Sequence, residues 1–169
     1  IPARYKSTRF PGKPLIDILG KPLVCRVAEI CEEAHPAEQV YIATDDVRIR
    51  DVATAAGHNV VMTSNQHPTG TDRLAEVSTK INADFYINVQ GDEPLIYPQD
   101  IKDVIEAKRL YPEDVIQAFC PITDGEDPSS LNIPKVVFAE NGSFIYCSRS
   151  LIPGSKKTPG QVYRFFKQV

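Results

Sequence analysis

The sequence predicts an α/β fold in which a mostly parallel β-sheet carries helices on both faces. Short β-branched runs alternate with amphipathic stretches four times along the chain, which is typical of such sheets. Asn141-Gly142 stands between two strand-like runs, which indicates a β-hairpin near residues 135–148. The 169 residues, 42% of them hydrophobic, favour one domain over residues 1–169. We expect that domain to be truncated at both ends.

Strands are expected where β-branched and aromatic residues cluster between turn residues. The first expected strand ends at Ala3. Further strands are expected over residues 39–44, 59–62, 84–90 and 115–122. The hairpin would pair residues 135–140 with residues 143–148.

Helices are expected where apolar residues recur at helical spacing. Pro22 is placed at the first position of a helix over residues 23–34. Asp45 or Asp46 would cap the next helix. Two more helices are expected, over residues 71–81 and from Pro98 onward.

The composition argues against several classes of protein. No apolar run approaches the roughly 20 residues of a membrane helix, and no basic-then-apolar secretory leader is visible. The four cysteines form no CxxC pair, which favours free thiols in a reducing compartment. The net charge is −3, and the two basic ends carry no aromatic–basic motif. We therefore expect a protein of a reducing compartment that binds neither membranes nor nucleic acid.

A basic loop follows the first expected strand. Four cations fall within it, namely Arg4, Lys6, Arg9 and Lys13. Ligands gather beyond the carboxyl ends of parallel strands, and Gly12 would let the backbone approach a ligand closely. The loop matches neither the Walker A nor the dinucleotide-binding motif, but its cations suit a triphosphate. A solvated basic loop is the alternative.

A second candidate site follows the strand expected at residues 84–90. Asp92 comes directly after Gly91, where a carboxylate is suited to hold Mg²⁺. Magnesium commonly takes one or two protein carboxylates, and phosphates complete its octahedron. The basic loop and Asp92 together would therefore suit metal-assisted phosphoryl or nucleotidyl transfer. Taken alone, Asp92 would more simply be a turn residue.

The third candidate region spans residues 67–73. Thr69 or Thr71 would cap the next helix, whose N-terminus suits an anion. Arg73 falls in the first turn, the unfavourable end of the helix dipole for a cation, so an anionic ligand is indicated, with a surface arginine as the alternative. Arg149, after the hairpin, is a weaker candidate. No nucleophile motif such as GxSxG is present, so a substrate hydroxyl would be the nucleophile.

Three motifs, in this order, resemble those of the 3-deoxy-manno-octulosonate (KDO) cytidylyltransferases, or CMP-KDO synthetases: IPARYKSTRFPGKPL (1–15), HPTGTDRLAEV (67–77) and INVQGDEPLI (87–96). YIATDD (41–46) and the stretch 135–153 fit the same family. The resemblance implies a nucleotidyltransferase domain of glycosyltransferase-A-like type. It implies magnesium-dependent transfer of CMP from CTP to the anomeric hydroxyl of KDO, for lipopolysaccharide or capsule synthesis. It also implies a cytoplasmic protein that is a homodimer when full length.

The resemblance also assigns roles to residues. Arg4 and Lys13 would be catalytic phosphate-binding cations, and Asp92 would be the catalytic aspartate that binds Mg²⁺. The nucleotide would contact Ala3, Arg4, Ser7, Arg9, Lys13, Gly70 and Thr71, and the sugar acid would contact Arg73, Gln90 and Arg149. The family's second metal-binding aspartate is expected beyond Val169.

Three other functions stay open at this point. The chain would also suit a cytidylyltransferase for another 2-keto-3-deoxy sugar acid, because the contacts that select the sugar are expected mostly beyond Val169. A truncated domain that binds the nucleotide without catalysis is a second alternative. Binding of a polyanion through the two basic ends is the third and the least favoured.

Overall fold

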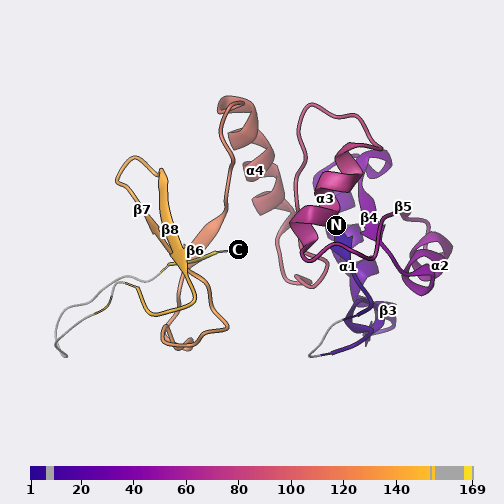
Figure 1. The fold of residues 1–169 in the computed structure, drawn as a ribbon, viewed down its shortest axis with the longest axis horizontal. Helices are drawn as coiled ribbons and strands as arrows, with labels where there is room; N and C mark the ends of the chain where they lie inside the picture. The colour runs from indigo at the N-terminus through magenta and orange to yellow at the C-terminus, as the bar shows by residue number, and fades with distance from the viewer. Residues whose placement is uncertain (7–9, 153, 155–165, 169) are drawn as a thin grey trace. The chain divides into compact units, whose positions relative to one another are not determined.

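Figure 1 shows the computed structural model, which describes residues 1–6, 10–152, 154 and 166–168. The chain divides into two compact units, Ile1–Leu110 and Tyr111–Val169. Each unit is described by itself. The assignment of residues 1–169 to one nucleotidyltransferase domain stays a prediction.

The first unit contains the predicted parallel sheet. Its strands β1 (Pro2–Ala3), β4 (Tyr41–Thr44) and β5 (Asn59–Met62) lie in the order β1-β4-β5. Three successive residues of β4, from Ile42 to Thr44, are buried. Because successive side chains of a strand point to opposite faces, both faces of the sheet are covered, as predicted.

Four helices of the first unit match the predicted ones. They are α1 (Leu23–Ala34), α2 (Val47–Ala55), α3 (Gly70–Ser78) and α4 (Pro98–Leu110). The Asp46 side chain caps α2 by accepting from the Arg48 N–H. Pro22 is the N-cap of α1 and not its first residue. Helix α3 ends at Ser78, short of residue 81, where the N–H groups of Thr79 and Lys80 donate to carbonyls three residues back at 3.0 and 2.9 Å, a tighter turn than an α-helix.

Short elements complete the first unit. Strands β2 (Asp17–Ile18) and β3 (Lys21–Pro22) form an antiparallel hairpin that the sequence analysis did not predict. The 3₁₀ helix η1 (Lys13–Leu15) precedes this hairpin, and the 3₁₀ helix η2 (Ala37–Gln39) precedes β4. Because Gln39 belongs to η2, strand β4 starts later than predicted. The apolar core joins α1, α2, α4 and the sheet around Val24, Val27 and Ile42.

The strand predicted over residues 84–90 does not form, although all of these residues are described. Phe85, Ile87 and Val89 pack on the core with the alternation of a strand. The Ile1 carbonyl accepts from the Ala43 N–H, so the polar groups of Pro2 face the opposite edge of β1. Proline has no N–H to donate. That edge therefore lacks one of the donors that a ladder with residues 84–90 would use.

The second unit contains an antiparallel sheet in the order β6-β9-β7-β8, part of it drawn in orange in Figure 1. Its strands are β6 (Phe119–Pro121), β7 (Lys135–Phe138), β8 (Phe144–Ser148) and β9 (Phe166–Gln168). The pairing of β7 with β8 confirms the predicted hairpin, and Gly142 has the positive φ of 84° that its turn requires. The α/β class is confirmed, with a larger antiparallel part than the hairpin alone.

The strand predicted over residues 115–122 is confined to β6, which pairs with β9 and not with the parallel sheet. Three aromatic rings explain this pairing. Phe119 stacks on Phe138 at 4.3 Å between ring centroids, and Phe166 meets both rings edge-on at 5.6 and 4.9 Å. The apolar run that predicted a strand thus packs on β7 and β9 within the second unit.

Two predictions from composition are tested by the structure. All four cysteines are free, as predicted, and burial raises the pKa of the Cys31 thiol to about 11, which keeps it unreactive at neutral pH. Over the part of the chain that the structure describes, every helix is too short or too polar to cross a membrane.

Candidate functional site

A cleft of about 630 Å³ opens beside the carboxyl end of β1. All three regions that the sequence analysis selected contribute to its lining. The predicted site residues that it brings together are Ala3, Arg4, Lys13, Gly70, Arg73, Gln90 and Asp92. Thr71 lies in the first turn of α3 and is not among the lining residues. Ser7 and Arg9 lie outside the described residues.

Lys13 and Asp92 meet in this cleft. Lys13 Nζ lies 2.6 Å from Asp92 Oδ2, and the two side chains are 42% and 48% exposed. Gly12, just before Lys13, has a φ of 76°, which glycine adopts without strain. An exposed ion pair contributes only about 0.2–1 kcal/mol. The pair can therefore open at little cost to let both charges bind a ligand.

Arg4 joins the first loop to the third region. Its Nη1 donates to the Pro68 carbonyl at 3.1 Å. Thr69 caps α3 with a capping box, in which the Asp72 N–H donates to Thr69 Oγ1 at 3.2 Å and the Thr69 N–H donates to Asp72 Oδ2 at 3.1 Å. The predicted cap at Thr69 is confirmed. The start of α3 thus lines the cleft with its capped, electropositive end.

Two glycines let the other regions approach β1 closely. A Cβ on Gly91 would lie 2.8 Å from the Pro2 carbonyl oxygen, and a Cβ on Gly70 would lie 3.1 Å from Pro2 Cγ. The same Cβ on Gly70 would lie 3.5 Å from the Gln90 side-chain oxygen. Glycine is needed at Gly91 because backbone blocks the space that a side chain would take.

Arg73 is the most buried of the charged residues around the cleft. Its side chain is 3% exposed, and Nη2 lies 2.9 Å from Asp45 Oδ1. Nη1 donates to the Thr63 hydroxyl and, at 3.4 Å, to the Ser64 carbonyl. The alternative of a surface arginine is therefore wrong. A cation at a helix N-terminus needs a negative partner, and for Arg73 the protein itself supplies one in Asp45.

Arg149 belongs to the second unit. Its Nη1 donates to the carbonyls of Leu131 and Asn132 at 3.0 and 3.3 Å. The guanidinium thus stabilises the loop before β7. A contact of Arg149 with the sugar acid stays a prediction.

The donor set around Asp92 suits one kind of metal ion. Among the described residues, no group of three or more His, Cys, Asp or Glu side chains is placed to hold a metal. A structural zinc or calcium site would need several such ligands. Magnesium accepts one carboxylate when phosphate oxygens and water complete its shell. Asp92, half-exposed beside two cations that suit phosphate, fits an ion that arrives with a polyphosphate.

Two residues that hold the first loop, Tyr5 and Arg48, were not predicted from the sequence. The Tyr5 carbonyl accepts from the Gly12 N–H at 2.9 Å and closes the loop. The guanidinium carbon of Arg48 lies 3.3 Å from the centre of the Tyr5 ring. An aromatic residue within a basic loop was the available signal, but its partner comes from α2, so no local pattern predicts the contact.

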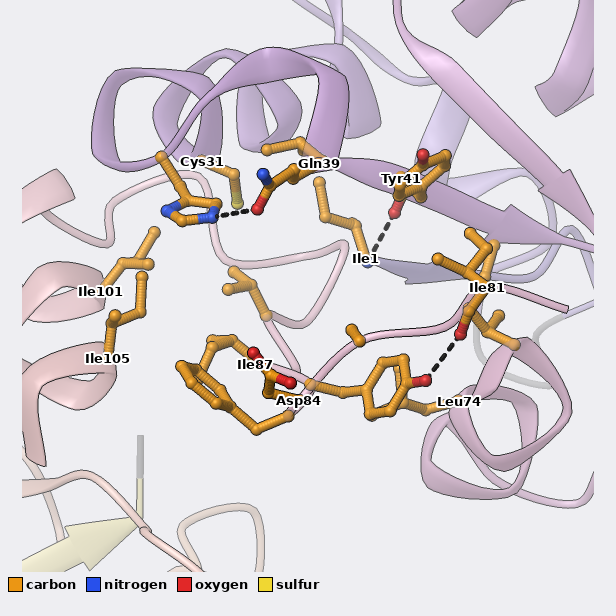
Figure 2. Close-up of a pocket in the computed structure, with 18 of the residues that line it drawn as sticks. Ile1, Cys31, Gln39, Tyr41, Leu74, Ile81, Asp84, Ile87, Ile101 and Ile105 are labelled. Carbon is orange, nitrogen blue, oxygen red and sulfur yellow. Dashed lines mark hydrogen bonds between the residues drawn. The ribbon is translucent and has the colours of Figure 1, made fainter. Parts of the chain in front are cut away.

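A second cavity, of about 510 Å³, lies elsewhere in the first unit. Figure 2 shows that Ile81, Ile87, Ile101 and Ile105 surround it. Several polar groups around it form hydrogen bonds within the protein. The Tyr86 hydroxyl donates to the Ile81 carbonyl at 2.6 Å, and Nε2 of the His35 ring lies 2.8 Å from Oε1 of the Gln39 side chain. Its largely apolar wall does not suit a triphosphate.

The chain was compared with known protein families and with curated sequences. A family model described as "Cytidylyltransferase" matches residues 1–169. The 3-deoxy-manno-octulosonate cytidylyltransferase of Escherichia coli is 42% identical over 153 residues, and that of Alcanivorax borkumensis is 46% identical over 157 residues. Each match covers 90% of this chain and 62% of the relative. The chain therefore spans about three fifths of the length of these relatives.

Solved structures give the same picture. A CMP:2-keto-3-deoxy-manno-octonic acid synthetase, solved in complex with CTP, matches with a TM-score of 0.90 and 40% identity, over 99% of this chain and 69% of that chain. A cytidylyltransferase from Leptospira borgpetersenii matches with a TM-score of 0.59 and 22% identity, over 76% of this chain and 54% of that chain, and shows the fold alone. The predicted nucleotidyltransferase fold is confirmed by the first of these matches.

Proposed function

Because the chain belongs to the cytidylyltransferase family, we propose that the protein transfers CMP from CTP to the anomeric hydroxyl of KDO and releases pyrophosphate. The observation that carries the proposal is the meeting of Lys13 and Asp92 in one cleft, 2.6 Å apart. A cation for the phosphates and a carboxylate for the metal are the two groups that this chemistry needs together. The names of the relatives support KDO as the acceptor.

The residues of the cleft would divide the work of the reaction. The sugar hydroxyl attacks the α-phosphorus of CTP, and pyrophosphate leaves. Lys13 and Arg4 would stabilise the negative charge that develops on the phosphate oxygens, an effect that depends on donors already in place. Asp92 would hold Mg²⁺, which neutralises phosphate charge when it is bound. Lys13 would exchange Asp92 for a phosphate oxygen, because the exposed pair is weak.

The nucleoside of CTP and the sugar acid would contact different walls of the cleft. Ala3 and Gly70 lie where the backbone is close to the cleft, which suits contacts with the nucleoside. Gln90, whose side-chain oxygen lies near Gly70, would contact the sugar acid. Arg73, which also lines the cleft, would contact the sugar acid as well.

The biological setting is part of the same proposal. The product, CMP-KDO, would serve the synthesis of lipopolysaccharide or capsule in the bacterial cytoplasm. The protein would act as a homodimer when full length. Neither nucleic acid nor a membrane is a proposed partner.

A coupled assay for pyrophosphate tests the proposed function. The intact protein is incubated with MgCl₂, one of the four nucleoside triphosphates, and either KDO or sialic acid. We expect release only with CTP and KDO, and none when EDTA replaces the metal. Release with another sugar acid would favour the alternative acceptor. CTP binding without release at any sugar concentration would favour the domain without catalysis, and either result would reject the proposed reaction.

A further inference from the structure

We infer that Asp45 and Asp46, which follow β4 directly, are positioning residues that hold the two walls of the cleft, each through one arginine. The inference rests on the proposed function, because it takes this cleft to be the nucleotide site. The sequence analysis assigned these carboxylates only to capping the next helix, a role that Asp46 fills as well. Their contacts reach further than the cap.

Asp45 holds the wall that begins α3. Its Oδ1 lies 2.9 Å from Arg73 Nη2, and the two side chains are 12% and 3% exposed. Arg73 also donates to Thr63 and Ser64, just after β5. A guanidinium this deeply buried at a helix N-terminus needs a negative partner. Asp45 therefore anchors the first turn of α3, which includes Gly70, on the ends of two strands.

Asp46 holds the opposite wall, which is the basic loop. Its two carboxylate oxygens accept from Arg48 Nε at 2.9 Å and from Arg48 Nη2 at 2.7 Å. This two-point contact fixes the plane of the guanidinium. The guanidinium carbon lies over the Tyr5 ring, 3.3 Å from its centre, which is a favourable cation–π contact.

The Tyr5 ring connects the fixed guanidinium of Arg48 to the basic loop. A Cβ on Gly12 would lie 3.2 Å from Tyr5 Cζ and from its hydroxyl oxygen, so the ring packs directly on the Gly12 backbone. The Gly12 N–H donates to the Tyr5 carbonyl at 2.9 Å. Tyr5 follows Arg4, and Gly12 precedes Lys13. Both phosphate-binding cations are therefore attached to the segment that the stack holds in place.

Asp45 and Asp46 are adjacent, but the local backbone directs their side chains to different walls of the cleft. Asp46 is extended, with φ of −114° and ψ of 124°, and neighbouring side chains of an extended chain point to opposite sides. One carboxylate thus reaches Arg73 and the other reaches Arg48. The pKa of Asp46 is lowered by its hydrogen bond with Arg48, which is consistent with a carboxylate that is charged when it holds the stack.

Loop-specific hydrogen exchange tests the inference in the intact protein without ligand. We expect Asp46→Asn to speed amide exchange in residues 10–16 and leave residues 67–73 unchanged. We expect Asp45→Asn to do the reverse. Asparagine caps helices as well as aspartate, so the Asp46 variant keeps the cap of α2 but loses the charge and one of the two oxygens that accept from Arg48. The matched control is Asp51→Asn, an exposed carboxylate of α2 that pairs with Arg50, which we expect to change neither loop.

Steady-state kinetics give the second readout. Each of the two variants should raise the KM for CTP about tenfold, the effect of losing one charged contact that positions the cleft, with a smaller change in kcat. Tyr5→Ala should match Asp46→Asn, and the double variant should be no worse than either one, because both changes break one stack. A purely structural defect would lower kcat through loss of folded protein and leave the KM unchanged.

The outcomes separate this inference from the proposed function. If the parent protein binds no CTP, the proposed function fails, while the exchange pattern still decides on the two carboxylates. If Asp45→Asn does not fold, the double variant Asp45→Asn/Arg73→Gln removes both buried charges and should show the same faster exchange in residues 67–73. Unchanged exchange in both loops, or the same change with Asp51→Asn, would overturn the inference.

Discussion

Lys13 and Asp92 form an ion pair of 2.6 Å across the cleft although they lie 79 positions apart in the sequence. The pair joins the basic loop after β1 to the turn that begins at Gly91. Each residue is nearly half-exposed, so the pair adds little to stability. Under the proposed function, the pair would place a cation and a carboxylate within reach of one polyphosphate.

We predict that Asp92→Asn abolishes most magnesium-dependent pyrophosphate release. The loss should be about 10²–10³ in kcat, the usual effect of removing one preorganised charge partner. The free energy of unfolding should change by less than about 1 kcal/mol, because the pair with Lys13 is exposed. Release is measured against Mg²⁺ concentration, with Glu106→Gln on α4 as the control. Turnover close to that of the parent would remove Asp92 from the mechanism.

We predict that Lys13→Ala raises the KM for CTP and lowers kcat. The lost cation would otherwise bind a phosphate in the ground state and stabilise it further in the transition state. The increase in Tm on addition of CTP and MgCl₂ should shrink, because stabilisation by a ligand follows its affinity. Lys102→Ala, an exposed lysine of α4, serves as the control. An unchanged Tm increase in the Lys13 variant would show that Lys13 does not contact the nucleotide.

We predict that Gly91→Ala destabilises the first unit and impairs CTP binding. The added Cβ would lie 2.8 Å from the Pro2 carbonyl oxygen, and forcing it in should cost about 1–3 kcal/mol. The shift would also move the neighbouring Asp92. Urea denaturation and CTP titration measure both effects. Gly125→Ala is the matched control, because a Cβ there meets open space; equal effects of the two variants would refute the steric argument.

We predict an acid-dependent loss of stability that depends on Glu76. Its carboxylate accepts from the Ser64 N–H at 2.7 Å and pairs with His67 and Lys80. The side-chain contacts with Lys80 and then His67 lower the pKa of Glu76 from 4.5 to about 2. A lowered pKa in the folded state means that the stabilisation is complete above pH 4.5 and is lost as the pH falls toward 2.

The test compares the Tm of the parent and of Glu76→Gln from pH 7 to pH 2. The variant should melt lower at pH 7, and the two curves should converge toward pH 2, where the parent carboxylate is protonated. Glu106→Gln is the control for a general charge effect. A constant difference across the whole pH range would contradict the role given to ionised Glu76.

Local patterns predicted the elements whose signals lie within a few residues. The Asn141-Gly142 dipeptide predicted the β7–β8 hairpin, and Asp46 predicted the start of α2. Local patterns failed where strand pairing depends on residues far away in the sequence. Residues 84–90 alternate as a strand should, but Pro2 offers no N–H at the adjacent edge of β1.

The same division holds for the site. Three sequence regions contained Arg4, Lys13, Gly70 and Asp92, and all of these residues line one cleft. For Arg73 the sequence predicted an anionic ligand, and the structure adds Asp45 as a partner within the protein. The contact of Tyr5 with Arg48 has no local signature, since the two residues come from different elements.

By itself the sequence determined the α/β class, the chemical nature of the three loops and their order, because residue type and spacing along the chain control caps, turns and the charge of a loop. Only the tertiary structure decided which charges face one another, which strands pair, and that the neighbours Asp45 and Asp46 contact Arg73 and Arg48. These outcomes depend on distances between residues far apart in the chain, and burial makes an unpaired charge or donor costly enough to select one arrangement.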